Sequence, residues 1–139
     1  FDQRRSAIIP ALRIVQDSNE GYLTIKLMDA VASFLQVPNM YVYEVATFYS
    51  MYELKRVGKY KLSVCTNISC MLNGSDEIVN YLKNKLNVNF NEVTKDGKFS
   101  LKEVECLASC GGAPVMQVGI KYYENLTIDK IDKILENLE

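Results

Sequence analysis

The sequence of 139 residues contains no histidine. Histidine is the commonest general base, the usual partner of a nucleophilic serine or cysteine, and the commonest metal ligand. Its absence therefore excludes serine triads, Cys-His nucleophiles and histidine-based metal sites. Any chemical function has to be argued through the four cysteines that remain.

A strong net charge and long apolar runs are also missing. Sixteen Lys and Arg residues stand against seventeen Asp and Glu residues, and the net charge of -1 argues against a nucleic-acid partner. Charged residues soon interrupt the apolar runs, as at 27–31, whereas a membrane span needs about 20 apolar residues in a row. We therefore expect neither nucleic-acid binding nor a membrane span.

The length and the start of the chain set two further expectations. With 139 residues, 48% of them hydrophobic, the chain can bury one core and is too short for two ordinary domains. Residues 1–5 include no initiating Met and no apolar signal core, so we expect a trimmed or processed start.

The cysteines form two pairs, Cys65 with Cys70 and Cys106 with Cys110, separated by 35 residues. Two disulfides, a structural zinc ion and an iron–sulfur cluster are the three alternatives. Disulfides concentrate in small secreted domains without a core, and zinc sites favour two residues between paired cysteines. Here four and three residues intervene, which suits a cluster whose two irons each take two thiolates. The spacing differs from that of plant-type ferredoxins.

Residues 59–139 read as a small α/β domain. Alternating apolar residues predict strands at 60–64, 89–94 and 99–105, with a hairpin turn at Asp96 and Gly97, and a short strand at 115–118. We expect a loop from Cys65 to Cys70, a helix capped by Ser75, and a last helix that begins after Thr127. Each cysteine pair would then follow a strand.

Residues 1–58 read instead as a three-helix segment. The expected apolar faces consist of residues 8, 12 and 15, then 27, 31 and 35, then 42, 45 and 49. Five aromatic residues near the third face either pack in the core and at its boundary, which we favour, or form a partner surface; they are Tyr41, Tyr43, Phe48, Tyr49 and Tyr52. Asn73-Gly74-Ser75 favours a helix cap over an anion site.

Several motifs together resemble one family, the thioredoxin-like 2Fe-2S subunit of respiratory complex I, NADH:quinone oxidoreductase. They are Val64-Cys65-Thr66-x3-Cys70, Val104-Glu105-Cys106-Leu107-x2-Cys110, Ala113-Pro114, Tyr122-Tyr123-Glu124-x-Leu126-Thr127 and Val42-Tyr43-Glu44-Val45-Ala46-Thr47-Phe48-Tyr49. The resemblance covers nearly the whole chain. Two departures concern the ligand loops, because Ser69 and Ala108 stand where many members have Pro and Gly.

The resemblance implies a mixed α+β or α/β fold, with a helical segment at 1–58 and a thioredoxin-like 2Fe-2S ferredoxin domain at 59–139. It implies one 2Fe-2S cluster on Cys65, Cys70, Cys106 and Cys110, and no catalytic residue. It also implies single-electron exchange with the FMN of a partner flavoprotein that oxidises NADH, so that the isolated chain has no activity. A dinucleotide-binding glycine motif is absent from the sequence, in agreement with this division.

The same resemblance leaves alternatives open. The chain could serve as the equivalent diaphorase subunit of a NAD-linked hydrogenase or formate dehydrogenase, or, from a different class, as a structural zinc-binding interaction module. Within complex I the partners would include other peripheral-arm subunits. The expected location is the cytoplasmic side of a bacterial inner membrane, or alternatively the matrix side of the mitochondrial inner membrane, with the chain bound peripherally. Glu105 is expected either to add negative charge beside the cluster or to remain a solvated strand-end carboxylate.

Overall fold

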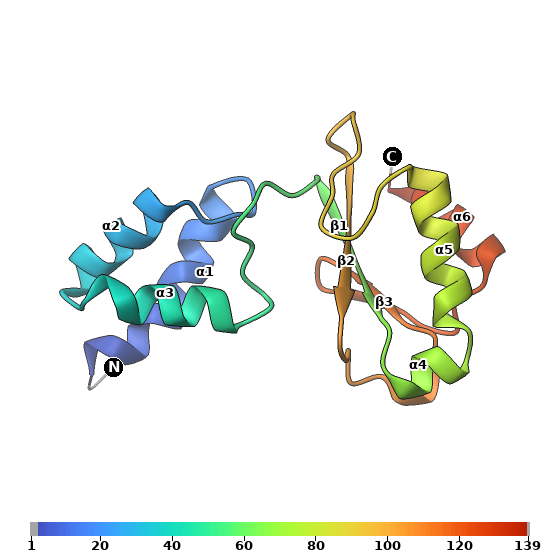
Figure 1. The fold of residues 1–139 in the computed structure, drawn as a ribbon, viewed down its shortest axis with the longest axis horizontal. Helices are drawn as coiled ribbons and strands as arrows, with labels where there is room; N and C mark the ends of the chain where they lie inside the picture. Colours follow the sequence, from blue (N-terminus) through green and yellow to red (C-terminus); the bar gives the residue numbers. More distant parts are fainter. Residues whose placement is uncertain (1–2, 139) are drawn as a thin grey trace. The chain divides into compact units, whose positions relative to one another are not determined.

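A computed structural model describes residues 3–138 and divides the chain into two compact units that meet between Arg56 and Val57. Each unit is described by itself (Figure 1). The expected processed start falls on Phe1 and Asp2, which lie outside the described residues. None of the helices within residues 3–138 has the length and apolar character needed to span a bilayer.

The first unit is helical, as the sequence predicts. A short 3-10 turn, η1 (Arg4–Ala7), leads into α1 (Ile8–Ser18), α2 (Ile25–Leu35) and α3 (Asn39–Phe48). The Thr24 hydroxyl accepts a hydrogen bond of 3.3 Å from the Leu27 N–H and caps α2. One apolar core joins the three helices; its fully or nearly fully buried members include Ile8, Leu12, Leu23, Val31, Ala32, Val42 and Ala46.

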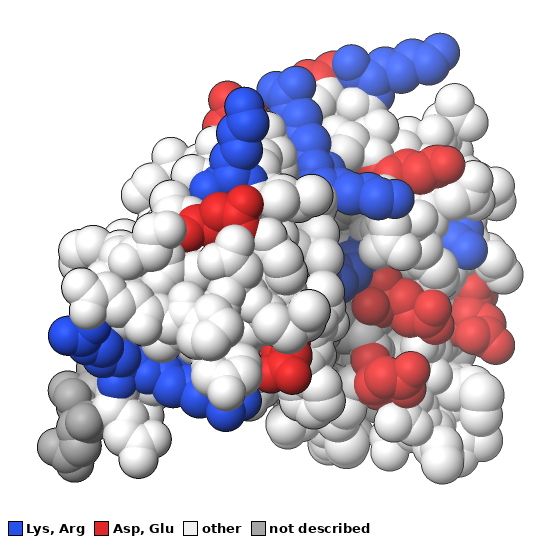
Figure 2. Space-filling view, turned by 60° about the vertical axis from the view of Figure 1, so that its left-hand side comes forward, with Lys and Arg blue, Asp and Glu red and all other residues white. Residues whose placement is uncertain are grey.

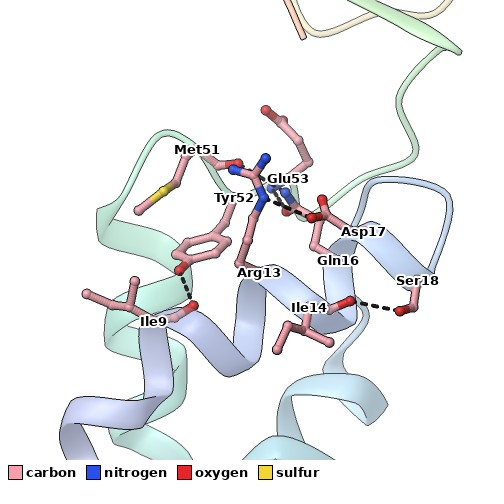
Figure 3. A network of polar contacts seen from close by, with 9 residues as sticks. All are labelled: Ile9, Arg13, Ile14, Gln16, Asp17, Ser18, Met51, Tyr52 and Glu53. Carbon is pink, nitrogen blue, oxygen red and sulfur yellow. Dashed lines mark hydrogen bonds and ion pairs between the residues drawn. The ribbon is translucent and has the colours of Figure 1, made fainter. Parts of the chain in front are cut away.

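A buried polar side chain ties the segment after α3 back to α1 (Figure 3). The Gln16 amide donates to the Met51 carbonyl at 3.1 Å and accepts from the Glu53 N–H at 2.7 Å. The Tyr52 hydroxyl donates to the Ile9 carbonyl at 2.8 Å. Because Gln16 is only 5% exposed, both ends of its amide need these partners, and they hold residues 51–53 against α1.

The expectation that the five aromatic residues are packed is wrong for three of them. Phe48 is 79% exposed, and Tyr41 and Tyr49 are more than a third exposed, whereas Tyr52 is buried and Tyr43 is half-buried. The reason is that α3 turns Val42 and Ala46, four residues apart, into the core. This narrow stripe leaves the neighbouring aromatic positions, including Tyr49 of the expected apolar face, on the outside.

The second unit is built on a four-stranded mixed sheet with the order β2-β1-β3-β4. Its strands are β1 (Tyr60–Cys65), β2 (Phe99–Val104), β3 (Met116–Val118) and β4 (Lys121–Tyr123). β1 and β2 are parallel, whereas β3 is antiparallel to both β1 and β4. This arrangement confirms the predicted mixed α/β fold.

Two helices cover one face of this sheet, α5 (Ser75–Leu86) and α6 (Ile128–Asn137) (Figure 1). They share a single apolar core with the strands, whose least exposed members are Leu62, Val64, Leu82, Leu101, Met116 and Ile131. The Asp132 carboxylate accepts hydrogen bonds of 2.5 Å from both the Tyr81 hydroxyl and the Lys85 ammonium, which joins the two helices at their surface.

The predicted strand at 89–94 is wrong. Only an isolated bridge pairs Val93 with Ser100, because Asn91 has a positive φ of 64° that interrupts the extended chain. The turn at Asp96 and Gly97 does form. Gly97 has a φ of 73°, which glycine adopts without strain, and its N–H donates to the Thr94 carbonyl at 2.8 Å.

Ser75 does not cap α5, contrary to expectation. Gly74 occupies the capping position, and the buried Ser75 hydroxyl finds no hydrogen-bond partner among the described residues. Glu77 and Asp129 line the cavity beside this helix start, and their carboxylates disfavour a bound anion there. On the molecular face drawn in Figure 2, acidic and basic side chains both occur, in keeping with a chain of nearly balanced charge.

Candidate metal centre

The parallel pairing of β1 and β2 brings the two cysteine pairs to one edge of the sheet. Cys65 is the last residue of β1 and pairs in register with Val104, the last residue of β2. Cys106 follows two positions later. Because the carboxyl ends of parallel strands lie at the same edge, the segments that carry the two pairs leave the sheet side by side.

The first pair lies on regular backbone. The Asn67 side chain accepts from the Ile68 N–H at 2.7 Å and caps a short helix, α4 (Ile68–Leu72), which contains Cys70. The expected loop from Cys65 to Cys70 is therefore wrong, since it is mostly a strand end and a helical turn. Both thiols are buried, with exposed fractions of 4% for Cys65 and 2% for Cys70.

The second pair lies on irregular backbone. Cys106 and Cys110 are exposed, and Cys110 opens the short 3-10 turn η2 (Cys110–Gly112). The Ala108 N–H donates to the Cys106 sulfur at 3.2 Å. Ala108 reaches this position with a positive φ of 54°, a left-handed conformation that costs an alanine about 1–2 kcal/mol.

A small apolar cluster connects the pairs. Leu107, which stands between Cys106 and Cys110, packs with Val115 against the buried thiols of Cys65 and Cys70. Burial raises the pKa of the Cys70 thiol to about 11, and the neighbouring thiols of Cys65 and Cys110 act in the same direction. The Cys65 thiol donates to the Glu105 carbonyl at 3.7 Å. Cys70 thus interacts with both Cys65 and Cys110.

This donor set fits an iron–sulfur cluster. All four cysteines are free thiols. A mononuclear zinc site needs four donors that converge on one ion. Within residues 3–138, no three Cys, His, Asp or Glu side chains form a group that could hold a single metal ion of any kind. A two-iron cluster instead takes two thiolates on each iron. Two pairs around a small apolar cluster, with an N–H that donates to a sulfur, match that demand.

The two departures from the family motif are compatible with the loop conformations. Ser69 is the second residue of α4, and the first turn of a helix accepts proline because its N–H groups have no partner within the helix. Ala108 adopts the left-handed conformation in which a glycine would be unstrained. Serine and alanine therefore keep the backbone that proline and glycine would favour.

Glu105 contributes to the site through its backbone. Its side chain is exposed beyond the end of β2, whereas its carbonyl accepts the Cys65 thiol. Sequence reasoning assigns no structural role to Glu124, although this carboxylate accepts a hydrogen bond from the Ser109 hydroxyl inside the second cysteine loop. Glu124 lies 15 positions after Ser109, so no local spacing rule connects them.

Two pairs of thiols at the edge of a small mixed sheet define an iron–sulfur protein with a thioredoxin-like ferredoxin architecture. The chain belongs to the thioredoxin-like [2Fe-2S] ferredoxin family, whose profile matches residues 1–139. Its cofactor is accordingly a 2Fe-2S cluster, as the sequence predicts.

Curated relatives share nearly half of the sequence. The chain is 48% identical over 133 residues to an NADH-quinone oxidoreductase subunit of Rickettsia felis, a match that covers 96% of this chain and 80% of the relative. It is 43% identical over 137 residues to an NADH-quinone oxidoreductase subunit of Rhizobium meliloti, with 99% and 81% covered.

A solved structure shares the fold at much lower identity. An air-oxidised NAD+-reducing [NiFe]-hydrogenase matches 95% of this chain with a TM-score of 0.78 and 14% sequence identity. The chain spans about a fifth of that hydrogenase chain, 22% of its length. At this identity the likeness shows the fold alone.

Proposed function

We propose that the chain is the electron-transfer subunit of an NADH:quinone oxidoreductase and carries its 2Fe-2S cluster on Cys65, Cys70, Cys106 and Cys110. The observation that carries the proposal is the placement of these four free thiols at one sheet edge. The relatives that share nearly half of the sequence bear the name of such a subunit. A hydrogenase diaphorase role has only the shared fold in its favour.

We further propose that Cys65 and Cys70 hold one iron and that Cys106 and Cys110 hold the other. Each pair belongs to one short segment, and the Cys65 and Cys70 thiols interact directly. When bound, the cluster accepts and donates single electrons. No bond-making residue on this chain is needed for that exchange.

The residues around the thiols prepare the site for electron transfer. Leu107 and Val115 exclude water from the buried pair, which lowers the local dielectric constant around the sulfurs. The Ala108 N–H orients the Cys106 sulfur, and hydrogen bonds to ligating sulfurs tune the reduction potential of iron–sulfur sites. The chain thus binds the cluster, shields it from water and tunes its reduction potential.

The proposed partner is the flavoprotein subunit that binds FMN and NADH, within an assembly that includes other peripheral-arm subunits. Two functional domains, 1–58 and 59–139, would divide the work between partner binding and cluster binding. In the first domain, the exposed Phe48 and Tyr49 line an apolar surface pocket on α3 together with Val45. We place the chain peripherally on the cytoplasmic side of a bacterial inner membrane, with the mitochondrial matrix side as the alternative.

Metal and sulfide analysis of the anaerobically purified chain tests the cofactor. We expect two irons and two acid-labile sulfides per chain, with visible charge-transfer bands, and no oxidation of NADH by the chain alone. A colourless protein with one zinc and no sulfide would establish the structural module instead. Tight binding of FMN or NADH by this chain would refute the division between subunits.

Surface substitutions test the partner-binding domain in the full chain. Phe48→Ser combined with Tyr49→Ser should weaken co-purification with the flavoprotein subunit while the cluster content stays unchanged, because both side chains are exposed. Ile120→Ser is the matched control, since Ile120 is 90% exposed on the cluster domain. Equal recovery of the partner with both variants would show that the interface does not include Phe48 and Tyr49.

A further inference from the structure

The Glu124 side chain lies directly across Gly112. A Cβ atom built on Gly112 would stand 2.6, 2.7 and 2.8 Å from the Cδ, Cβ and Cγ atoms of Glu124. Such distances are shorter than any ordinary contact, and one of the atoms belongs to the base of the side chain, which cannot swing away. Only glycine at position 112 allows the carboxylate to pass this closely.

Hydrogen bonds fasten the same two segments. The Glu124 carboxylate accepts from the Ser109 hydroxyl, which stands immediately before Cys110. The Asn125 N–H donates to the Gly112 carbonyl at 2.6 Å, and the Leu126 N–H donates to the Pro114 carbonyl at 3.1 Å. Residues 124–126 therefore lie along the whole stretch that carries Cys110.

Helix α6 holds the backbone of Glu124 in place. The Lys130 ammonium, from the first turn of α6, donates to the Glu124 carbonyl at 2.5 Å. The Thr127 hydroxyl caps α6 by accepting from the Lys130 N–H at 3.3 Å. The backbone at Glu124 is thus anchored by α6, and α6 is itself packed into the core of the sheet.

We infer that Glu124 is a positioning residue for the fourth ligand, Cys110. This inference rests on the proposed ligation of the cluster by Cys110. Glu124 acts through two contacts, the packing of its side chain across Gly112 and the acceptance of the Ser109 hydroxyl. Both contacts restrain an exposed loop that has no strand or α-helix of its own, so the sulfur of Cys110 keeps one position relative to the sheet.

Chelator challenge of the cluster-loaded full chain tests this role. Glu124→Ala removes the acceptor for the Ser109 hydroxyl and all packing beyond Cβ, and it should speed cluster loss roughly tenfold, since residues that orient metal ligands typically contribute 10–100-fold to metal retention. Glu124→Gln keeps the packing and an amide acceptor, so its rate of loss should stay within roughly twofold of the unmodified chain. Glu136→Ala, at an exposed position of α6, is the matched control.

The spectrum and potential of the cluster provide a second readout. Loosening Cys110 changes the geometry at one iron, so Glu124→Ala should alter the electron paramagnetic resonance spectrum of the reduced cluster and shift its midpoint potential. Glu124→Gln should restore both. A variant that merely lowered the stability of the fold would leave the signal of the surviving clusters unaltered.

A double-mutant cycle tests the contact with Gly112. Gly112→Ala should displace the Glu124 side chain and speed cluster loss, and its effect should shrink in the Glu124→Ala background, which lacks Cδ and Cγ and keeps only the Cβ of the three crowding atoms. Additive effects would overturn the proposed contact. Failure of Glu124→Gln to rescue, or an effect of Glu124→Ala no larger than that of Glu136→Ala, would overturn the inference.

These outcomes are distinguishable from a failure of the proposed function. If the unmodified chain binds no cluster with two irons, the proposed function fails before any variant is compared. If the unmodified chain binds the cluster and Glu124→Ala retains it equally well, only the positioning role is refuted.

Discussion

The two cysteine pairs of this chain are held by different kinds of structure. Cys65 ends a strand and Cys70 lies in a capped helical turn, and both are buried. Cys106 and Cys110 lie in an exposed segment after β2, without a strand or α-helix around them. The first pair is placed by backbone hydrogen bonds and burial.

The second pair depends on contacts from elsewhere in the fold. Leu107 anchors the exposed segment by packing against the buried first pair, and Glu124 contacts the same segment from the stretch before α6. One half of the candidate metal site is therefore rigid because its cysteines lie in a strand and a helix, whereas the other half is held by side chains from other segments. Substitutions and chemical probes can test this asymmetry, beginning with the largest expected effect.

Removal of one ligand from each pair should give unequal losses. Cys70→Ser places a shorter ligand in a buried helical turn that cannot move toward the iron, so we expect cluster content to fall about tenfold. Cys110→Ser changes a segment that is held by contacts from Glu124 and Leu107 and not by a helix or strand of its own, so it yields more than a buried helical turn, and we expect a larger residual content. Iron and sulfide analysis of anaerobically purified variants measures both. Equal losses would show that the exposed loop is as rigid as the buried turn.

Alkylation of the cluster-free chain should separate the pairs by rate. Burial raises the pKa of the Cys70 thiol from 9.0 to about 11. The thiolate is the reactive form, and at pH 8 such a thiol carries roughly a hundredfold less thiolate than one with the ordinary pKa. Iodoacetamide at pH 8 should therefore modify Cys106 and Cys110 well before Cys70, as followed by mass spectrometry. The Cys70 rate should rise with pH up to about 11. In guanidinium chloride the rates should converge.

The strand that delivers Cys65 could be predicted because Tyr60, Leu62 and Val64 alternate over its whole length. The helical turn around Cys70 could not, since α4 has five residues and is too short to show a helical period. Its only signal is Asn67, a favoured capping residue directly before Ile68. The four candidate ligands were named from spacing and resemblance, but their unequal burial could not be predicted.

Other differences between expectation and structure have local causes. Apolar alternation at 89–94 suggested a strand, but the positive φ of Asn91 leaves only Val93 in a bridge. The aromatic residues of α3 suggested a core, yet Val42 and Ala46 already fill the buried stripe. The approach of Glu124 to Gly112 had no signal beyond the glycine itself, because tertiary contacts between distant segments carry no period in the sequence.

Truncation of Leu107 should loosen the exposed segment. Leu107→Ala removes the side chain that packs against Cys65 and Cys70, and we expect a loss of about 2–3 kcal/mol in the free energy of unfolding, at the low end for a buried leucine. Denaturant titration of the full chain measures it. Leu72→Ala, at a 76% exposed position of α4, should change stability by less than about 0.5 kcal/mol. A comparable loss at both sites would place the anchor elsewhere.

Relief of strain in the exposed segment should have the smallest effect and the opposite sign. Ala108→Gly removes a left-handed alanine worth about 1–2 kcal/mol of strain, while the extra freedom of glycine in the unfolded chain costs about 0.4–1 kcal/mol. We therefore expect a net stabilisation of about 0.5 kcal/mol, measured as a higher thermal midpoint. Ala113→Gly is the control, because Ala113 has an ordinary φ of -62° and releases no strain; it loses stability through the freedom of glycine in the unfolded chain and through the loss of a packed methyl group. If both variants lose stability equally, Ala108 is unstrained, and the exposed loop is held without a local cost.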